Sequence, residues 1–139
     1  IIELSDGEDA ASLYRKVAKA HLYLINKNYP KILADSIRFE PQNNEKATVW
    51  PARRACDGEI DLSSSVVTAH RLVRATTRPY PGAFIKLGGK KITIWSGRCH
   101  LNSTSREKEQ RVEVPKGENP VINFKDGELE LLSFEVEII

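Results

Sequence analysis

A pair of glycines between two short apolar runs limits most strongly how this chain can fold. Ala83–Leu87 and Lys91–Trp95 are rich in isoleucine and aromatic side chains, and Gly88 and Gly89 lie in the link between them. Glycine takes positive φ at little steric cost, and two-residue loops of this kind match the twist of paired strands. We therefore predict an antiparallel hairpin here, with its second strand continuing to about His100.

A proline-rich turn lies directly before this hairpin. Pro79 and Pro81 fix φ and disfavour helix at the residues that precede them, and Gly82 allows angles closed to other residues. Further upstream, Ser65 is a good N-cap for a helix that ends near Thr76. The turn has two interpretations, a structural corner or a fixed binding edge, and its residue types favour the corner.

The N-terminal residues predict a long helix. Asp9 is a good N-cap. The apolar side chains that follow it recur at helical spacing on one face: Leu13, Val17, Ala20 and Leu24. We predict a helix from about Ala10 to Asn28, which Pro30 ends or restarts. Ile32 and Leu33 are then expected to pack down in a last turn.

The polar stretch Glu40–Glu45 is turn-rich and indicates a connector. We accordingly divide the chain into a helical arm, residues 1–40, and a barrel domain, residues 41–139.

Short runs predict four strands besides the hairpin: Ala47–Trp50, Arg111–Val114, Pro120–Phe124 and Glu128–Ile138. The apolar phase of the last run changes near Leu131–Ser133, which predicts a bulge. Leu101–Gln110 is polar and predicts a mobile loop. Short antiparallel strands at this spacing favour a mainly β fold with α, a small barrel preceded by the helical arm.

Charge is distributed unevenly along the chain. Residues 71–117 hold 11 basic and 3 acidic side chains, a net charge of +8, whereas residues 118–139 hold 1 basic and 6 acidic, a net charge of −5. The basic segment is a candidate surface for nucleic acid or a phosphorylated small molecule, or its cations keep strand edges soluble. The candidate residues for contacting such an anionic ligand are six cations around the proline turn: Arg71, Arg74, Arg78, Lys86, Lys90 and Lys91.

Several classes of protein are disfavoured by the composition. No run of about 18 apolar residues is present, which excludes a membrane-spanning helix. The two cysteines, Cys56 and Cys99, lack zinc-site spacing, and without a secretory signal they indicate free thiols in a cytoplasmic protein that binds no metal. No nucleophile–base motif or phosphate-cradling glycine loop is present. The absence of Met predicts that residue 1 is not the natural start.

Four pieces of the sequence occur in a characteristic order and spacing: Pro51–Asp61, His70–Ala75, Pro79–Phe84 and Gly89–Trp95. Together they resemble the C-terminal domain of the methionyl-tRNA formyltransferase family, which includes sugar-nucleotide N-formyltransferases. Asp9–Val17 is similar to the family helix that closes the catalytic domain. The likeness covers about residues 8–100, and beyond them only the entry to the last strand fits. Leu62 stands where the family often has Trp.

The resemblance implies transfer of a formyl group from 10-formyltetrahydrofolate to a primary amine, that of methionyl-tRNA or of an amino-sugar nucleotide. It implies catalysis in an N-terminal α/β domain with an Asn, a His and an Asp, and a C-terminal open barrel similar to the OB fold that helps to hold the acceptor. The family's His-x-Ser-x-Leu-Pro and Asp-x-Gly-x-Ile segments are absent from this sequence. We therefore assign no catalytic residue here, and expect 10-formyltetrahydrofolate in the N-terminal domain rather than in this segment.

An alternative function is a non-catalytic OB-like module for binding or oligomerisation. In proteins with this kind of barrel, nucleic-acid bases stack on exposed aromatic rings. The aromatic candidates are Trp50, Tyr80, Phe84 and Trp95. We expect at least three of these rings to be buried, and stacking fails as a mode of recognition if all four are.

Overall fold

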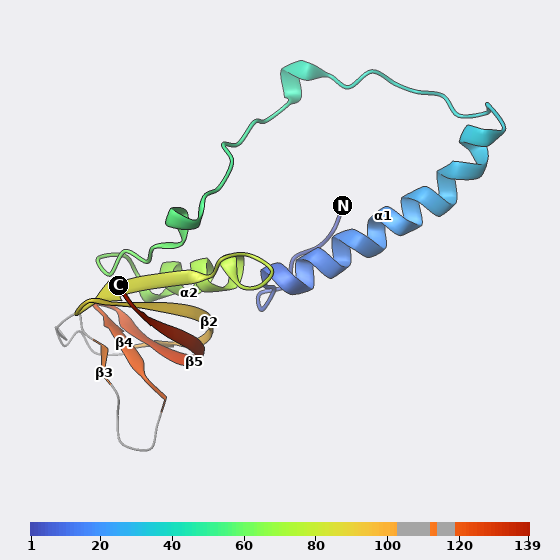
Figure 1. The fold of residues 1–139 in the computed structure, drawn as a ribbon. Helices are drawn as coiled ribbons and strands as arrows, with labels where there is room; N and C mark the ends of the chain where they lie inside the picture. Colours follow the sequence, from blue (N-terminus) through green and yellow to red (C-terminus); the bar gives the residue numbers. More distant parts are fainter. Residues whose placement is uncertain (103–111, 114–118) are drawn as a thin grey trace.

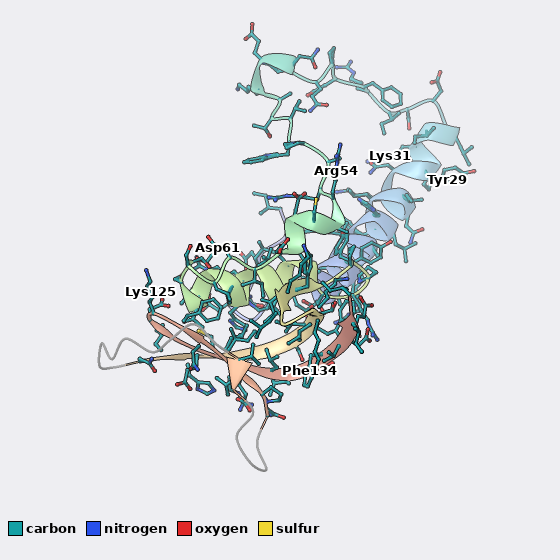
Figure 2. All side chains as sticks on the ribbon, turned by 60° about the vertical axis from the view of Figure 1, so that its left-hand side comes forward. Tyr29, Lys31, Arg54, Asp61, Lys125 and Phe134 are labelled. Carbon is teal, nitrogen blue, oxygen red and sulfur yellow. The ribbon has the colours of Figure 1, made fainter. Side chains whose placement is uncertain are left out.

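The computed structural model describes residues 1–102, 112–113 and 119–139, and it consists of a sheet domain with a long helix reaching away from it (Figure 1). The helix, α1, spans Ala10–Leu33. The chain then returns to the sheet through an extended segment that contains one short 3-10 turn, η1, Asn44–Lys46. Tyr29 and Lys31, at the far end of α1, project away from the sheet domain (Figure 2).

The sheet is antiparallel, with strand order β1-β2-β5-β4-β3. Its strands are β1 Ala83–Leu87, β2 Lys90–Leu101, β3 Val112–Glu113, β4 Val121–Phe124 and β5 Gly127–Ile138. The fold is therefore mainly β with α, an open half-barrel consistent with the OB-like prediction and preceded by the helical arm. The two long strands, β2 and β5, form its centre. The division at residue 40 stays a prediction.

The glycine hairpin and the proline corner are as predicted. Leu87 pairs with Lys90, and the linking Gly88 and Gly89 have φ of 56° and 71°. Before the hairpin, the amide of Gly82 donates to the carbonyl of Thr76 at 2.9 Å, which folds the turn back onto the end of the helix. The turn is thus a structural corner between the helix and the sheet.

One helix, α2, covers one face of the sheet. It spans Val66–Thr76, and the Ser65 Oγ accepts from the amide of Thr68 at 3.0 Å, as predicted for an N-cap. A second cap comes from far along the chain, since the Asp126 carboxylate accepts from the amide of Val66 at 2.9 Å. The buried core joins this helix to the strands through Ile60, Val66, Ala69, Val73, Ala83, Ile85, Ile94, Ile122, Phe124, Leu129 and Leu131.

The predicted bulge in the last strand is present. Ile94 pairs with Phe134 and Gly97 with Leu131, and the register shifts twice between them, so that Trp95 on β2 and Leu132 on β5 are left without a direct partner. The shift reconciles the two apolar phases of β5, because Phe134 and Val136 come to lie opposite Ile94 and Ile92, which belong to the core or pack on it. Leu129 and Leu131, before the shift, are buried, and residues 132–138 are exposed.

The prediction that Pro30 ends or restarts the first helix was wrong. α1 continues without a break to Leu33, with Pro30 inside it. It ends instead in a Schellman motif, in which the amide of Asp35 (φ 48°) donates to the carbonyl of Ile32 and that of Ser36 donates to Lys31. Ile32 and Leu33 do not pack down as expected but are 49% and 71% exposed.

The predicted strand Ala47–Trp50 was also wrong. These residues pair with no strand of the described ranges, and Val49 is 94% exposed. Of the predicted loop 101–110, Leu101 is instead the last residue of β2, and residues 103–110 lie outside the described part of the chain. Arg111 and Val114, the ends of the predicted third strand, also lie outside it.

In the described ranges, no helix is long and apolar enough to span a bilayer.

Candidate anion-binding groove

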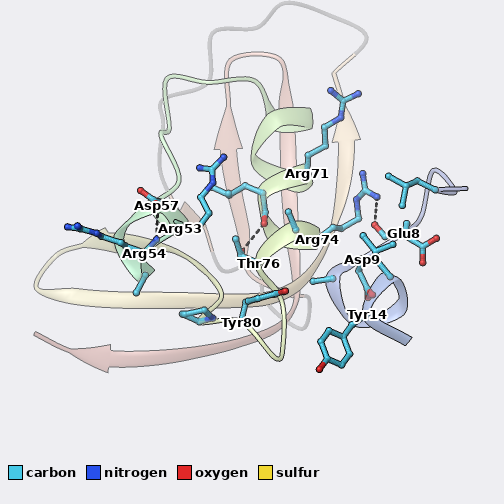
Figure 3. Close-up of a pocket in the computed structure, with 18 of the residues that line it drawn as sticks. Glu8, Asp9, Tyr14, Arg53, Arg54, Asp57, Arg71, Arg74, Thr76 and Tyr80 are labelled. Carbon is cyan, nitrogen blue, oxygen red and sulfur yellow. Dashed lines mark hydrogen bonds between the residues drawn. The ribbon is translucent and has the colours of Figure 1, made fainter. Parts of the chain in front are cut away.

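A groove of about 1020 Å³ lies where the start of α1 meets α2 and the short 3-10 turn η2, Ala55–Gly58 (Figure 3). Its apolar lining comes from Leu13 and Val17 of α1 and from Leu72 and Ala75 of α2. The proline corner closes one side, with Tyr80 and Pro81 both contributing to the lining. The groove therefore joins the arm, the helix and the corner, three pieces that are far apart in sequence.

Arg74 holds the start of the arm against α2. Its guanidinium Nη1 donates to the backbone carbonyls of Asp6 and Glu8, both at 2.7 Å. The Nε of Arg74 is buried without a hydrogen-bond partner among the described residues. Because two carbonyls already occupy one end of this guanidinium, the main effect of Arg74 is to position the turn before α1.

The carboxylates at the groove are already satisfied by neighbouring groups. Glu8 accepts from the side chains of Lys16 and Ser12, which lowers its pKa from 4.5 to about 2. Asp9 accepts from the amide of Ser12 at 2.7 Å, and this hydrogen bond lowers the pKa of the Asp9 carboxyl. Asp57 accepts from the amide of Arg54 at 2.7 Å. These acidic groups therefore serve helix and turn caps.

Three arginines at the groove have no ion-pair partner in the described part of the chain. Arg53 and Arg54 come from the segment that enters η2, and Arg71 comes from α2 (Figure 3). All three are exposed. The lining holds four arginines against three carboxylates, and Lys16 pairs with one of these carboxylates, so the net charge at the groove is positive. An apolar groove bordered by free guanidinium groups suits a ligand that carries an anionic group such as phosphate.

The structure divides the six predicted cations into separate groups. Arg71 and Arg74 line the groove. Three others lie across the sheet and are paired with carboxylates: Arg78 with Glu135 at 2.7 Å, Lys86 with Glu59 at 3.0 Å and Lys91 with Glu137 at 3.4 Å. Lys90 is exposed beside the glycine link and forms no ion pair within the described ranges. That any of the six binds an acceptor stays a prediction.

Sequence reasoning missed the contribution of Arg53 and Arg54. They precede the basic segment 71–117 and follow Pro51, so the charge distribution did not single them out. The signal available was the Arg-Arg pair itself, placed just before a turn that the Asp57 carboxylate caps. Only the fold shows that this pair borders the same groove as Arg71.

Comparison with known proteins identifies the domain that contains these elements. The family model of the formyl transferase C-terminal domain matches residues 53–137, which is more than half of the chain. This chain belongs to the formyl transferase C-terminal domain family. A similar solved structure is the methionyl-tRNA formyltransferase from Clostridium thermocellum, with 21% sequence identity and a TM-score of 0.44 over 84% of this chain. The match spans 39% of the length of that protein.

The matched region of this formyl transferase C-terminal domain begins at Arg53, so the arginine pair, α2, the corner and the hairpin lie inside it. The arm α1 lies outside it. The groove thus forms where the family domain meets the residues that precede it, and Glu8, Asp9 and Leu13 are contributed from outside the match.

The aromatic side chains of this domain are less buried than predicted. Phe84 is 6% exposed, and Trp95 is half-buried under the guanidinium of Arg78, whose carbon lies 4.5 Å from the ring centre. Trp50 and Tyr80 are 82% and 50% exposed. The expectation that at least three of the four would be buried was therefore wrong. Tyr80 lines the groove, whereas Trp50 belongs to the extended segment before it.

A second polar cluster on the sheet centres on Glu130. Its carboxylate accepts from Asn119 at 2.8 Å and is paired with Arg98 at 3.3 Å and with His100 at 3.2 Å. These neighbours, Asn119 first, lower the pKa of Glu130.

Cys56 and Cys99 are free thiols, and burial raises the pKa of the Cys99 thiol. Across the described ranges, no three His, Cys, Asp or Glu side chains are grouped to hold a metal ion.

Proposed function

We propose that this chain is the C-terminal part of a 10-formyltetrahydrofolate-dependent formyltransferase that acts on a primary amine, and that its groove orients the acceptor. Membership of the formyl transferase C-terminal domain family supports the reaction class. The observation that carries the role of the groove is its set of three uncompensated arginines beside an apolar lining. Such a site binds and positions an anionic substrate and supplies no nucleophile or base.

The chemical step belongs, in this proposal, to an N-terminal α/β domain. The sequence lacks the two catalytic segments of the family, and no residue of this chain is assigned to hold the folate. The exposed apolar side chains along α1, among them Leu22, Tyr23 and Ile25, suit a helix that packs against such a domain. The role of the chain is thus to present the acceptor to chemistry performed elsewhere.

Between the two acceptor classes, the charge arrangement favours an amino-sugar nucleotide over methionyl-tRNA. A tRNA requires an extended array of free cations along its phosphates. Arg78, Lys86 and Lys91 are instead paired with Glu135, Glu59 and Glu137. Arg53, Arg54 and Arg71, which have no ion-pair partner among the described residues, lie at the groove, where a compact diphosphate can accept charge-assisted hydrogen bonds.

Binding measurements on arginine variants test this assignment. We expect Arg53→Ala and Arg71→Ala each to weaken binding of a nucleoside-diphosphate amino sugar, measured by titration calorimetry, by roughly tenfold or more, since hydrogen bonds to charged groups contribute about 1.5–3 kcal/mol. Arg38→Ala is the matched control, because Arg38 is exposed but lies outside the groove. Equal losses in all three variants would contradict a site in the groove.

Two further measurements separate the reaction from the acceptor. The 139-residue chain incubated with 10-formyltetrahydrofolate and candidate amines should give no turnover, and appreciable turnover would overturn the placement of catalysis in another domain. For the acceptor class, tRNA affinity is measured at low and high salt. Tight binding at low salt that weakens steeply with added salt would favour methionyl-tRNA over the sugar nucleotide.

A further inference from the structure

The outer half of β5 is a free sheet edge. Its first residues, Gly127–Glu130, pair with β4 on one side and with β2 on the other. The amide of Leu131 donates to the carbonyl of Pro120 at 2.8 Å, which marks the end of contact on the β4 side. Within the described residues, 133–138 then pair with β2 alone, and Leu132 lies at the bulge without a direct partner. One row of backbone N–H and C=O groups along these residues is left open.

An exposed apolar row accompanies this open edge. After the bulge, Phe134, Val136 and Ile138 alternate onto one face and are exposed by 37%, 50% and 88%, and Leu132 at the bulge is exposed by 44%. Glu135 and Glu137 point to the other face, where Arg78 and Lys91 pair with them. Edge strands are usually protected against pairing by Lys, Pro or a short length. Residues 132–138 contain neither Lys nor Pro.

We propose that this edge binds the same edge of a second copy of the chain, so that two β5 strands form one continuous antiparallel sheet. The two copies are related by a two-fold axis perpendicular to the sheet, which keeps both apolar rows on the same face. In such an arrangement one residue of the strand lies directly opposite the same residue of the second copy, and the axis passes between the two. Main-chain hydrogen bonds then supply affinity, and the side chains select the register.

We call the residue that lies opposite its own copy the centre of the register. The charges and the open part of the edge select the register centred on Phe134. That register places Leu132 opposite Val136 of the second copy and Glu135 opposite Ser133, so that apolar residues meet apolar residues and no carboxylates are opposed. A centre at residue 135 or 137 sets a glutamate against its own copy, and a centre at 136 sets Glu135 against Glu137. Like charges directly opposite are unfavourable in a sheet.

The two remaining centres, residues 133 and 138, are disfavoured for other reasons. A centre at residue 133 requires Leu131, whose amide is already bound to Pro120. A centre at residue 138 leaves the exposed Leu132, Phe134 and Val136 without a partner in the apolar row of the second copy. The register centred on Phe134 uses five residues, 132–136, all of them on the open edge. It is therefore the most complementary symmetric pairing that this strand offers.

Single-cysteine cross-linking tests the register in a background with Cys56→Ser and Cys99→Ser. Phe134→Cys should form a disulfide-linked dimer on oxidation, because directly opposed residues in an antiparallel pair have Cα atoms about 4.5–5.5 Å apart. Val136→Cys and Ile138→Cys should not link to themselves. In this register position 136 and its copy are offset by four residues, roughly 13 Å, beyond the ~7 Å limit of a disulfide. A mixture of Leu132→Cys and Val136→Cys should link.

Analytical ultracentrifugation of the intact chain provides the second test. The chain should show a concentration-dependent monomer–dimer equilibrium, which Ser133→Lys strengthens by facing Glu135 and Ser133→Glu weakens for the same reason. Both changes are made at one exposed position, so circular dichroism should be unaltered. A chain that stays monomeric at all concentrations would overturn the proposal. So would a dimer that cross-links through position 136 alone or ignores the charge at position 133.

Discussion

Gly82 joins the proline corner to the first strand under two separate constraints. Its φ is +88°, a backbone conformation that side chains disfavour. A Cβ built on it would lie 2.7 Å from Thr93 Cγ2 and 2.9 Å from Trp95 Cζ3. Both neighbours belong to β2, and the corner presses against that strand. The residue therefore sets how closely the end of α2 approaches the sheet, and with it the position of Tyr80 and Pro81 at the groove.

These constraints predict the effect of adding a single methyl group. Gly82→Ala should lower the free energy of unfolding by about 2 kcal/mol or more, because the positive φ and the close packing each carry a cost of that order. Gly7→Ala is the matched control, since no atom lies within 4 Å of a Cβ at that position. Urea denaturation measures both variants, and equal, small effects would contradict the account of the corner.

Glu8 makes the attachment of the arm sensitive to acid. Its folded pKa is about 2 against an ordinary value of 4.5, chiefly because the Lys16 ammonium donates to the carboxylate. A depressed folded pKa means that ionised Glu8 stabilises the fold above pH 4.5, and that this contribution is lost as the pH falls toward 2. Thermal unfolding should therefore separate wild type from Glu8→Gln near neutral pH, and the difference should vanish near pH 2. A constant difference at both pH values would refute this.

Among the elements, those with local and strong signals could be predicted from sequence. The hairpin followed from Gly88-Gly89, the cap of α2 from Ser65, and the bulge in β5 from the change of apolar phase. The end of α1 could not be read from Pro30, because a Schellman motif five residues later supplies an ending that local propensity did not reveal. The run Ala47–Trp50 has strand-like residues, but within the part of the chain that the structure describes no strand pairs with it.

The groove was less predictable than the elements that form it. The charge pattern predicted Arg71 and Arg74 as site residues, but it could not show that one is free and the other is bound to the arm. That difference depends on contacts between residues more than sixty positions apart in the sequence, such as the hydrogen bond from Arg74 to the carbonyl of Asp6. Arg53 becomes part of the groove only because η2 packs beside α2. Sequence patterns show which residues are charged, whereas long-range packing decides which charges remain free.

The N-terminus of α2 depends on a residue from the other end of the domain. The Asp126 carboxylate caps the amide of Val66, and Asp126 belongs to the turn that leads into β5. Asp126→Ala should therefore lower the free energy of unfolding by about 1 kcal/mol, as for the loss of other helix caps. Asp126→Asn keeps an accepting oxygen and should retain most of the stability. If the two variants proved equally unstable in urea denaturation, the cap would not be the cause.

For the whole molecule, folding brings part of the basic segment and part of the acidic segment together within the described residues. The basic segment 71–117 and the acidic segment 118–139 meet because β2 and β5 are paired along their length. Arg78, Lys91 and Arg98 of the first then face Glu135, Glu137 and Glu130 of the second. A net charge counted along the chain is therefore a poor guide to the surface that a polyanion would meet.

This pairing of charges can be tested by removing the compensating carboxylates. The triple variant Glu59→Gln, Glu135→Gln, Glu137→Gln frees Lys86, Arg78 and Lys91, and should bind heparin or tRNA more tightly and with a steeper dependence on salt. The control triple Glu3→Gln, Glu40→Gln, Glu45→Gln changes the net charge equally but alters carboxylates that pair with none of these three cations. Salt-gradient elution from a heparin column compares the two. If both variants eluted at the same salt concentration, net charge alone would govern binding, and the pairing of β2 with β5 would not mask these cations.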